Sequence, residues 1–300
     1  IDTSVPQTFV ITVTLVNDAP TGALIIAGTP TKGEVLSADT SGISDADGLG
    51  VFSYLWSNGA TTSSITLGDS DVGSAITVTV SYTDGHGTLE SLASVTVGPV
   101  ANVNDVPVGL PVIVGIAEED QVLTVDTSGI SDADGVGTFS YLWSTGATTS
   151  SITLGDLDVG SSITVTVIYT DGHGTLESLA SAAVGPVANV NDAPTGVPTI
   201  SGAAQNGSVL IAGTGGISDA DGLGVFSYQW LRDGVAIAGA TGSTYLLSSS
   251  DVGTLIRVQF SYIDGHDTSE GPLTSTQTTP VTDVTEGGTK FFVVDQSRRG

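Results

Sequence analysis

The feature that most constrains the fold of this chain is a tandem repeat. The hexapeptide Ile-Ser-Asp-Ala-Asp-Gly begins at Ile43, Ile130 and Ile217, positions that lie 87 residues apart. A tandem repeat of this kind points to stacked modules. The sequence therefore predicts a row of similar domains.

Other landmarks follow the same spacing and set the predicted boundaries. Asn-Asp-x-Pro begins at Asn17, Asn104 and Asn191. Asp-Val-Gly begins at residues 71, 158 and 251, so the third repeat carries six extra residues. We predict residues 1–16 as the last strand of a truncated preceding repeat, 17–103 and 104–190 as two repeats, 191–284 as a third with a six-residue insertion, and 285–300 as a tail. We expect the chain to be a segment of a longer protein.

Composition and pattern within a repeat favour an all-β fold. Gly, Ser and Thr are abundant, and Lys and Glu are rare, which disfavours long helices. In the first repeat, strands are expected at 23–27, 34–38, 51–57, 64–67, 76–82 and 92–100, separated by turn residues. Many short alternating strands in about 90 residues indicate an immunoglobulin-like Greek-key β-sandwich. We therefore predict an extended tandem array of such sandwiches, with Trp56 and its copies Trp143 and Trp230 in the cores.

The third repeat and the two ends carry further signals. Asp233-Gly234 is typical of a type I′ hairpin turn, so the insertion is expected to add a hairpin. Apolar and polar side chains alternate along 5–16, and 290–294 is also strand-like. Such end strands could pair with another copy of the chain.

Charge limits the partners of this chain. It has 32 acidic residues against six basic ones, a net charge of −26. The chain would be repelled by nucleic acids and anionic membranes, and no apolar run has the length of a membrane span. Cys is absent, which excludes disulfides and thiolate metal sites. The remaining partner is a hard cation, and calcium is the one we predict outside cells.

Strand order predicts where the acids meet. Loops alternate between the two ends of a sandwich, so the Asp-x-Asp loop and the last hairpin of one repeat face the preceding linker. The expected ligands at the first junction are Asp69, Asp71, Asn102, Asn104, Asp105, Asp132, Asp134 and Asp171. At the second junction they are Asp156, Asp158, Asn189, Asn191, Asp192, Asp219, Asp221 and Asp264. Before the first repeat they are Asn17, Asp18, Asp45, Asp47 and Asp84, an incomplete set because no preceding repeat is in the sequence.

These residues carry a resemblance to a known family. Ser-Asp-Ala-Asp-Gly at 44–48, Tyr-Thr-Asp-Gly at 82–85 and Asn-Val-Asn-Asp-Val-Pro at 102–107 resemble a cadherin-type repeat. The chain is more similar still to the cadherin-like and immunoglobulin-like repeats of giant bacterial surface adhesins of the RTX-adhesin type. The resemblance implies interdomain calcium held by the Asp-x-Asp pair, the hairpin Asp and the linker Asn and Asp residues.

No motif indicates catalysis, and the sequence predicts a protein that is not an enzyme. The histidines His86, His173 and His266 recur one per repeat in a turn and are expected to be solvated. The predicted function is that of a stalk segment of a secreted or cell-surface adhesin, bacterial in origin, stiffened by calcium. Two alternatives remain: a self-assembling extracellular fibre, and an accessory region of a large secreted enzyme.

Overall fold

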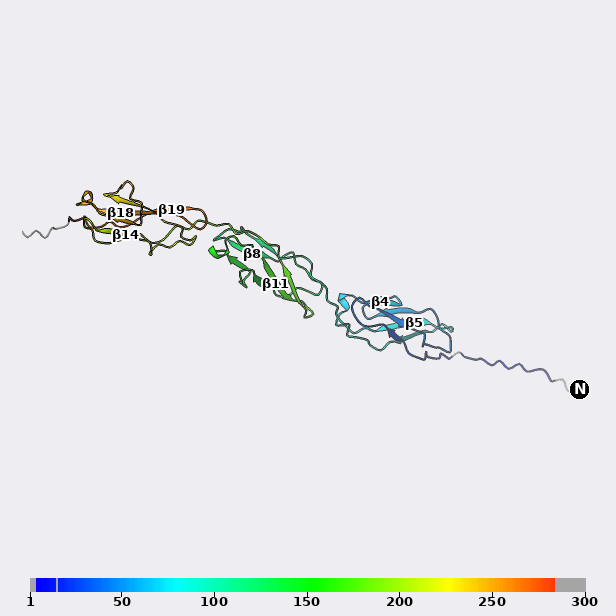
Figure 1. The fold of residues 1–300 in the computed structure, drawn as a ribbon. Helices are drawn as coiled ribbons and strands as arrows, with labels where there is room; N and C mark the ends of the chain where they lie inside the picture. Colours follow the sequence, from blue (N-terminus) through cyan, green and yellow to red (C-terminus); the bar gives the residue numbers. More distant parts are fainter. Residues whose placement is uncertain (1–3, 15, 284–300) are drawn as a thin grey trace, which may run out of the picture. The chain divides into compact units, whose positions relative to one another are not determined.

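The computed structural model describes residues 4–14 and 16–283 and is all-β in this range (Figure 1). Its described strands form six small antiparallel sheets, accompanied by three single-turn 3₁₀ helices. Contacts within the chain divide it into two units. The first unit takes the described residues of 1–112 with 126–142 and 165–181, and the second takes the rest.

The first repeat is a two-sheet sandwich. One sheet has the order β1-β2-β4, from Ile25–Ala27, Val35–Asp39 and Ser64–Thr66. The other has the order β3-β5-β6, from Ser53–Trp56, Val78–Thr83 and Leu89–Ala93. Both sheets contribute to one core that includes Leu36, Trp56 and Val80. In the immunoglobulin fold, strands A, B and E belong to one sheet and strands C, F and G to the other, and the six strands of this repeat divide in the same way.

The middle repeat has the same elements, and the boundary between the two units runs through it. The sheet β12-β11-β9, from Leu176–Ala180, Val165–Thr170 and Ser140–Trp143, lies mainly in the first unit. The sheet β10-β8-β7, from Ser151–Thr153, Val122–Asp126 and Val112–Val114, lies mainly in the second. The repeat boundaries drawn from the sequence stay a prediction.

The third repeat gains one strand. One sheet has the order β13-β14-β17, from Thr199–Ser201, Val209–Gly213 and Thr244–Leu246. The other has the order β16-β15-β18-β19, from Val235–Ala236, Ser227–Arg232, Ile256–Ile263 and Ser269–Thr274. Asp233 and Gly234 both have positive φ, at 49° and 84°, between the paired strands β15 and β16. The type I′ hairpin predicted for the insertion is confirmed.

The core tryptophans are also confirmed. Trp56, Trp143 and Trp230 are exposed by 1%, 2% and 0%. Each indole N–H donates to a backbone carbonyl, of Thr62, Thr149 and Gly242 respectively. A buried donor is thereby satisfied in each repeat.

Two strand predictions differ from the structure. The last strand of the first repeat was expected at 92–100, but β6 ends at Ala93. There the Ser94 hydroxyl accepts from the Val78 N–H at 3.1 Å, in place of a backbone carbonyl, and the regular ladder is interrupted. Pairing resumes only as an isolated bridge between Ile76 and Val97.

The predicted N-terminal strand does not form in the described residues 4–14. The side chains of Phe9, Val10 and Ile11 are 85%, 86% and 85% exposed. A strand needs a neighbouring edge for its hydrogen bonds, and no described strand pairs with these residues. The predicted strand at 290–294 lies outside the described residues. No helix in the described part of the chain has the length and apolar character to cross a membrane.

Candidate metal centres

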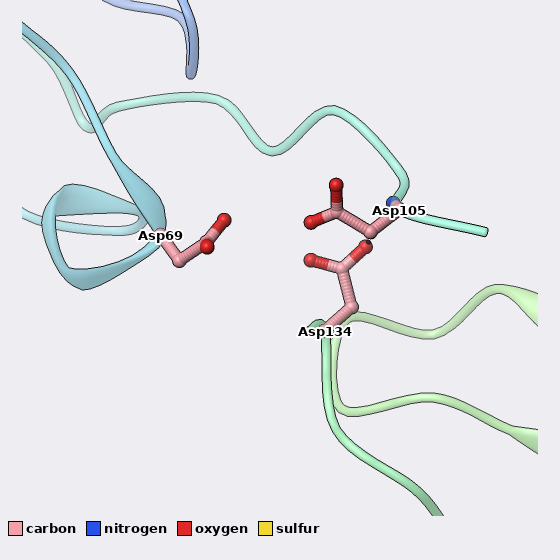
Figure 2. A group of neighbouring side chains, drawn as sticks. All are labelled: Asp69, Asp105 and Asp134. Carbon is pink, nitrogen blue, oxygen red and sulfur yellow. Dashed lines mark hydrogen bonds between the residues drawn. The ribbon is translucent and has the colours of Figure 1, made fainter. Parts of the chain in front are cut away.

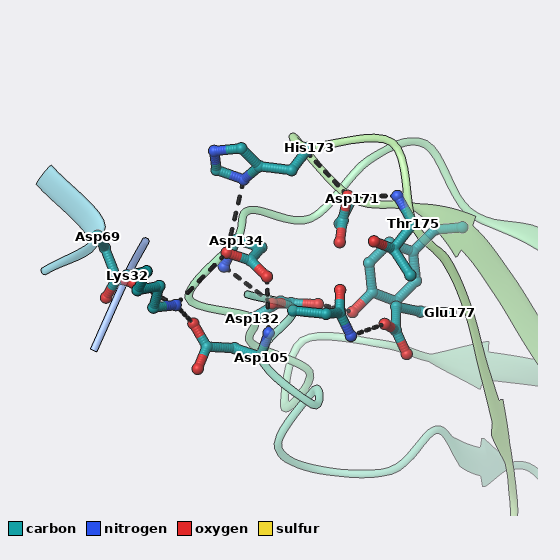
Figure 3. A network of polar contacts seen from close by, with 11 residues as sticks. Lys32, Asp69, Asp105, Asp132, Asp134, Asp171, His173, Thr175 and Glu177 are labelled. Carbon is teal, nitrogen blue, oxygen red and sulfur yellow. Dashed lines mark hydrogen bonds and ion pairs between the residues drawn. The ribbon is translucent and has the colours of Figure 1, made fainter. Parts of the chain in front are cut away.

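A loop with two aspartates begins the acidic end of each repeat, and the middle repeat shows its geometry (Figure 3). Asp132 accepts from the Asp134 N–H at 2.9 Å and from the Tyr169 hydroxyl at 2.6 Å. Burial, and then this contact with Asp132, raises the pKa of Tyr169, which keeps the phenol a donor. Asp134 accepts from the backbone N–H of Asp105 in the linker at 2.7 Å. The loop is thus bonded to the linker that precedes it.

The hairpin after β11 adds a third carboxylate with one unpartnered oxygen. One oxygen of Asp171 accepts from the N–H groups of His173 and Thr175 at 2.8 and 2.7 Å. Although burial opposes ionisation, these bonds lower the pKa of Asp171, so it is a carboxylate. Its other oxygen, Oδ2, is buried with no hydrogen-bond partner among the described residues, and Asp171 is only 6% exposed. A buried carboxylate oxygen in this state requires a cation or a proton donor.

The same orphan oxygen recurs in all three repeats. Asp84 and Asp264 are also 6% exposed, and each has a buried Oδ2 without a partner. Each accepts two backbone N–H bonds on its other oxygen, as Asp171 does. The Asp-x-Asp loops repeat as well, with Tyr82 donating to Asp45 and Tyr262 to Asp219. The recurrence makes this a property of the repeat rather than of one loop.

A glycine allows the two loops to approach. The Gly172 N–H donates to the Asp134 carbonyl at 2.9 Å, and a Cβ on Gly172 would lie 2.5 Å from that oxygen. No side chain fits there without moving the backbone. Gly85 and Gly265 make the same approach, to Asp47 and Asp221.

A glutamate from the last strand completes the group at this end. Glu177 in β12 is 9% exposed and accepts from the Asn104 side-chain amide at 2.9 Å. Its copies Glu90 and Glu270 accept from Asn17 at 2.8 Å and Asn191 at 2.9 Å. These glutamates are not among the ligands predicted from the sequence, although their spacing from the hairpin Asp is constant. The donated amide N–H leaves the carbonyl oxygen of the linker Asn available as a ligand.

The opposite end of a repeat is built around a short loop and a 3₁₀ helix. In the first repeat the Lys32 N–H donates to the Ala101 carbonyl at 3.0 Å, and the Ala101 N–H donates to Pro30 at 2.8 Å. This parallel bridge holds the loop against the start of the linker. The helix η1, Asp69–Asp71, also lies at this end and presents Asp69 to the linker (Figure 2).

These elements form the first of two linker clusters of carboxylates. In the first linker cluster, carboxylate oxygens of Asp69, Asp105 and Asp134 lie within 4.8 Å of one another. The Lys32 ammonium contacts Asp69 and Asp105 and lies 3.7 Å from Asp134 (Figure 3). Its hydrogen bonds to Asp105 and then Asp69 raise the pKa of Lys32, which stays charged.

The second linker cluster has the same form without an ammonium from the described part of the chain. Carboxylate oxygens of Glu119, Asp192 and Asp221 lie within 4.8 Å of one another. Glu119 is 2% exposed, and its contact with Asp156, followed by burial, raises its pKa. Burial, and then the charge of Asp156, raises the pKa of Asp192. Like charges therefore crowd this cluster, and oxygens that share one calcium ion lie at most about 5 Å apart.

The structure brings together many, but not all, of the ligands predicted from sequence. Asp69, Asp105 and Asp134 meet, as do Asp192 and Asp221 with Asp156 beside them. Asn102 and Asn189 each have a buried side-chain oxygen without a partner in the described structure. In the first repeat Asp47 accepts from the Asp18 N–H at 2.7 Å, so Asn17, Asp18, Asp45, Asp47 and Asp84 are arranged as in the later copies.

Asp71 and Asp158 take another role. Asp71 accepts from the Gly68 N–H at 2.9 Å and caps its own 3₁₀ helix, and Asp158 does the same with Gly155 at 3.1 Å. Neither belongs to the grouped carboxylates of the described residues. The histidines are exposed, as expected, but two also face a carboxylate: His86 lies 2.8 Å from Asp47, and His173 lies 3.5 Å from Asp134.

Fold and site together define a class: tandem immunoglobulin-like β-sandwiches with acidic loops and linkers. No protein-family model and no curated protein matches the chain. Tandem repeats of large adhesins are among the similar solved structures. A tetra-tandem repeat from the extending region of a large adhesion protein is 18% identical, with 87% of this chain and 74% of that one covered and a TM-score of 0.27.

Two further structures illustrate the range. A calcium-stabilized adhesin that helps an Antarctic bacterium to reach and bind ice is 12% identical, with 89% and 75% of the chains covered and a TM-score of 0.29. A run of titin domains is 12% identical, with 88% and 99% covered and a TM-score of 0.26. Overlaps of this size do not assign a function to this chain.

Proposed function

We propose that this chain is a structural segment of the stalk of a secreted or cell-surface adhesin, with calcium bound at the acidic ends of its repeats. The observation that carries the proposal is the orphan oxygen of Asp84, Asp171 and Asp264, repeated once per sandwich. Enzymes place such carboxylates in a cleft, whereas here each lies in a loop beside a linker. A structural role fits this placement better than a catalytic one.

The donor atoms favour calcium among the common metals. All candidate ligands are carboxylate, amide or backbone oxygens, and the chain has no Cys. Calcium takes six to eight oxygens in flexible geometry, whereas magnesium prefers an octahedron that retains several waters. At one acidic end, Asp132, Asp134, Asp171, Glu177 and the Asn104 carbonyl supply such a set. In the second linker cluster, Glu119, Asp156, Asp192 and Asp221 supply another.

The proposed mechanism is mechanical. Without a cation, carboxylates of the linker and of the following repeat repel one another at short range. With calcium bound, the linker oxygens and the loop oxygens share one ion, so the linker loses freedom to bend. Successive repeats then act as a stiffer spacer that holds an attachment module away from the cell. Extracellular modules bind calcium with a Kd of about 10⁻⁴–10⁻³ M, which suits a surface protein.

Thermal unfolding and scattering test this proposal. The whole chain, first stripped with chelator, is expected to unfold at a higher temperature when calcium is restored, because calcium binds only the folded loops. Small-angle scattering is expected to report a larger radius of gyration with calcium than with chelator. Unchanged melting temperature and unchanged dimensions would refute the calcium mechanism.

One observation favours a second candidate, a self-assembling extracellular fibre. Phe9, Ile11 and Val13 are at least 80% exposed, in a segment without a strand partner. Such a segment can add to the sheet edge of another copy. A fibre subunit would assemble with concentration in sedimentation experiments, and deletion of residues 1–16 would stop the assembly. A chain that stays monomeric at all concentrations would exclude this candidate.

A further inference from the structure

We infer that Lys32 is a built-in cation that takes the place of calcium in the first linker cluster, so the two linkers respond differently to calcium. The inference rests on the proposed function and adds to it a difference between junctions. Lys32 is the one Lys or Arg among residues 1–231. In a chain with a net charge of −26, the position of this single ammonium is informative.

Lys32 and Glu119 occupy the same place in their repeats, 87 residues apart. The backbone contacts match: the Lys32 N–H donates to Ala101 at 3.0 Å, and the Glu119 N–H donates to Ala188 at 2.9 Å. Each side chain is therefore delivered to the linker by the same parallel bridge. The difference between the two clusters lies in the side chain and not in the fold.

In the first linker cluster an ammonium already pairs with the acids and neutralises part of their charge. Lys32 is 14% exposed in its side chain and contacts Asp69 and Asp105, with Asp134 at 3.7 Å. An ammonium in contact with three carboxylates occupies the space that a metal ion would need. It also lowers the attraction of the cluster for a second cation. We therefore expect this cluster to bind no calcium.

In the second linker cluster the corresponding side chain adds a negative charge. Glu119 is 2% exposed, and one of its oxygens, Oε2, accepts from the Val190 N–H at 3.1 Å. Its side chain also contacts that of Asp156, a second acid. Between the two linker residues bonded to Glu119 lies Asn189, whose buried side-chain oxygen also has no partner. Four carboxylates therefore converge without an ammonium from the described residues, in a linker whose Asn189 amide oxygen is also unsatisfied, and a divalent cation is the ligand that satisfies them.

The consequence is a chain with one calcium-independent linker cluster and one calcium-dependent linker cluster. Loss of calcium would loosen the second linker while the Lys32 ion pairs still hold the first. The orphan oxygens of Asp84, Asp171 and Asp264 lie at the acidic ends of the repeats. They can bind calcium whichever residue stands at position 32 or 119.

The test exchanges the two residues in the whole chain. Calcium binding is measured by calorimetric titration of the chelator-stripped wild type, K32E and E119K. K32E is expected to bind about one ion more than the wild type, and E119K about one ion fewer. In chelator, K32E is expected to melt below the wild type and E119K above it. E119Q keeps the size of Glu119 without its charge and is expected to weaken calcium binding without adding an ion pair.

The outcomes separate the inference from the proposed function. If the wild type binds calcium but both exchanges leave the number of ions unchanged, the inference is overturned and the proposed function stands. If the wild type binds no calcium, the proposed function itself fails. If K32E does not fold, K32M serves instead: it is expected to melt below the wild type in chelator, and equal melting would overturn the inference. Fluorescence of the buried tryptophans reports whether each variant is folded.

Discussion

Replacing Asp171 by Asn tests the orphan oxygen most sharply, because the change keeps the shape of the side chain. The amide oxygen can still accept from the N–H groups of His173 and Thr175, now at 2.8 and 2.7 Å. The unpartnered carboxylate oxygen becomes an amide NH₂, which cannot bind a cation. We expect a modest loss of stability without calcium and a much larger one with calcium.

The two parts can be estimated separately. Hydrogen bonds to charged groups contribute about 1.5–3 kcal/mol and neutral ones about 0.5–1.5 kcal/mol. Making the acceptor of the His173 and Thr175 bonds neutral should therefore lower the free energy of unfolding by about 2 kcal/mol. The lower cost of burying a neutral group offsets part of this loss. Calcium at 100 times its Kd adds about 2.7 kcal/mol to the free energy of unfolding of the wild type. For a domain of about 90 residues this corresponds to a rise of about 11–22 °C in Tm, most of which Asp171→Asn should lose.

Differential scanning calorimetry of the whole chain, in chelator and in calcium, measures both parts. Asp264→Asn is expected to remove the calcium-induced rise in Tm of the third repeat in the same way. Asp126→Asn is the matched control, since Asp126 accepts from exposed Ser128, whose backbone N–H lies at 2.8 Å, and lies outside the clusters. If Asp171→Asn and Asp126→Asn show the same calcium-induced rise in Tm as the wild type, the orphan oxygen does not bind calcium.

Other predictions concern stability and the site. Asp251 is 0% exposed and pairs with Arg232 at 2.5 Å. Arg232→Met should therefore lower the free energy of unfolding of the third repeat by about 3 kcal/mol in urea titrations. Arg257→Met, which removes only an exposed hydrogen bond to Gln277, should lower it by less than about 0.5 kcal/mol, and equal losses would contradict this. Burial opposes ionisation of Asp251, but bonds from Ser248, Arg232 and Tyr245 outweigh it and lower its pKa. Its stabilising contribution is therefore present above the unfolded pKa of about 3.9 and lost as the pH falls through the folded-state value. In Arg232→Met that loss should begin at higher pH, and unchanged acid titrations would argue against the pair. Gly172→Ala should lower the free energy of unfolding by about 1–3 kcal/mol and weaken calcium binding, because the added Cβ would collide with the Asp134 carbonyl. Gly155→Ala should have neither effect, because a Cβ at Gly155 meets no atom within 4 Å.

Much of the fold could be predicted because its signals are local. Alternation placed the side chains of Ile76, Val78 and Val80 on one face, and all three are at most 1% exposed. Turn chemistry located the hairpin at Asp233 and Gly234. Because successive loops of an antiparallel sandwich alternate between its two ends, Asp69, Asp105 and Asp134 could be predicted to lie close together, and in the structure they do.

What the sequence could not show depends on non-local backbone contacts. Lys32 lies beside the linker because its neighbour Thr31 forms a parallel bridge with Ala101, and no periodicity in the sequence predicts such a bridge. Asp69 and Asp71 look equivalent in sequence, yet within one 3₁₀ turn Asp71 folds back on the Gly68 N–H while Asp69 faces the linker. The end of β6 shifted because a hydroxyl, that of Ser94, replaced a carbonyl in the ladder.

Calorimetric titration of the chelator-stripped whole chain with calcium, beside the same titration with magnesium, tests the central claim most directly. We predict saturable calcium binding that magnesium does not reproduce, with a matching rise in Tm. An absence of binding heat together with an unchanged Tm would contradict the account, because the repeated orphan oxygens would then be satisfied without a metal ion.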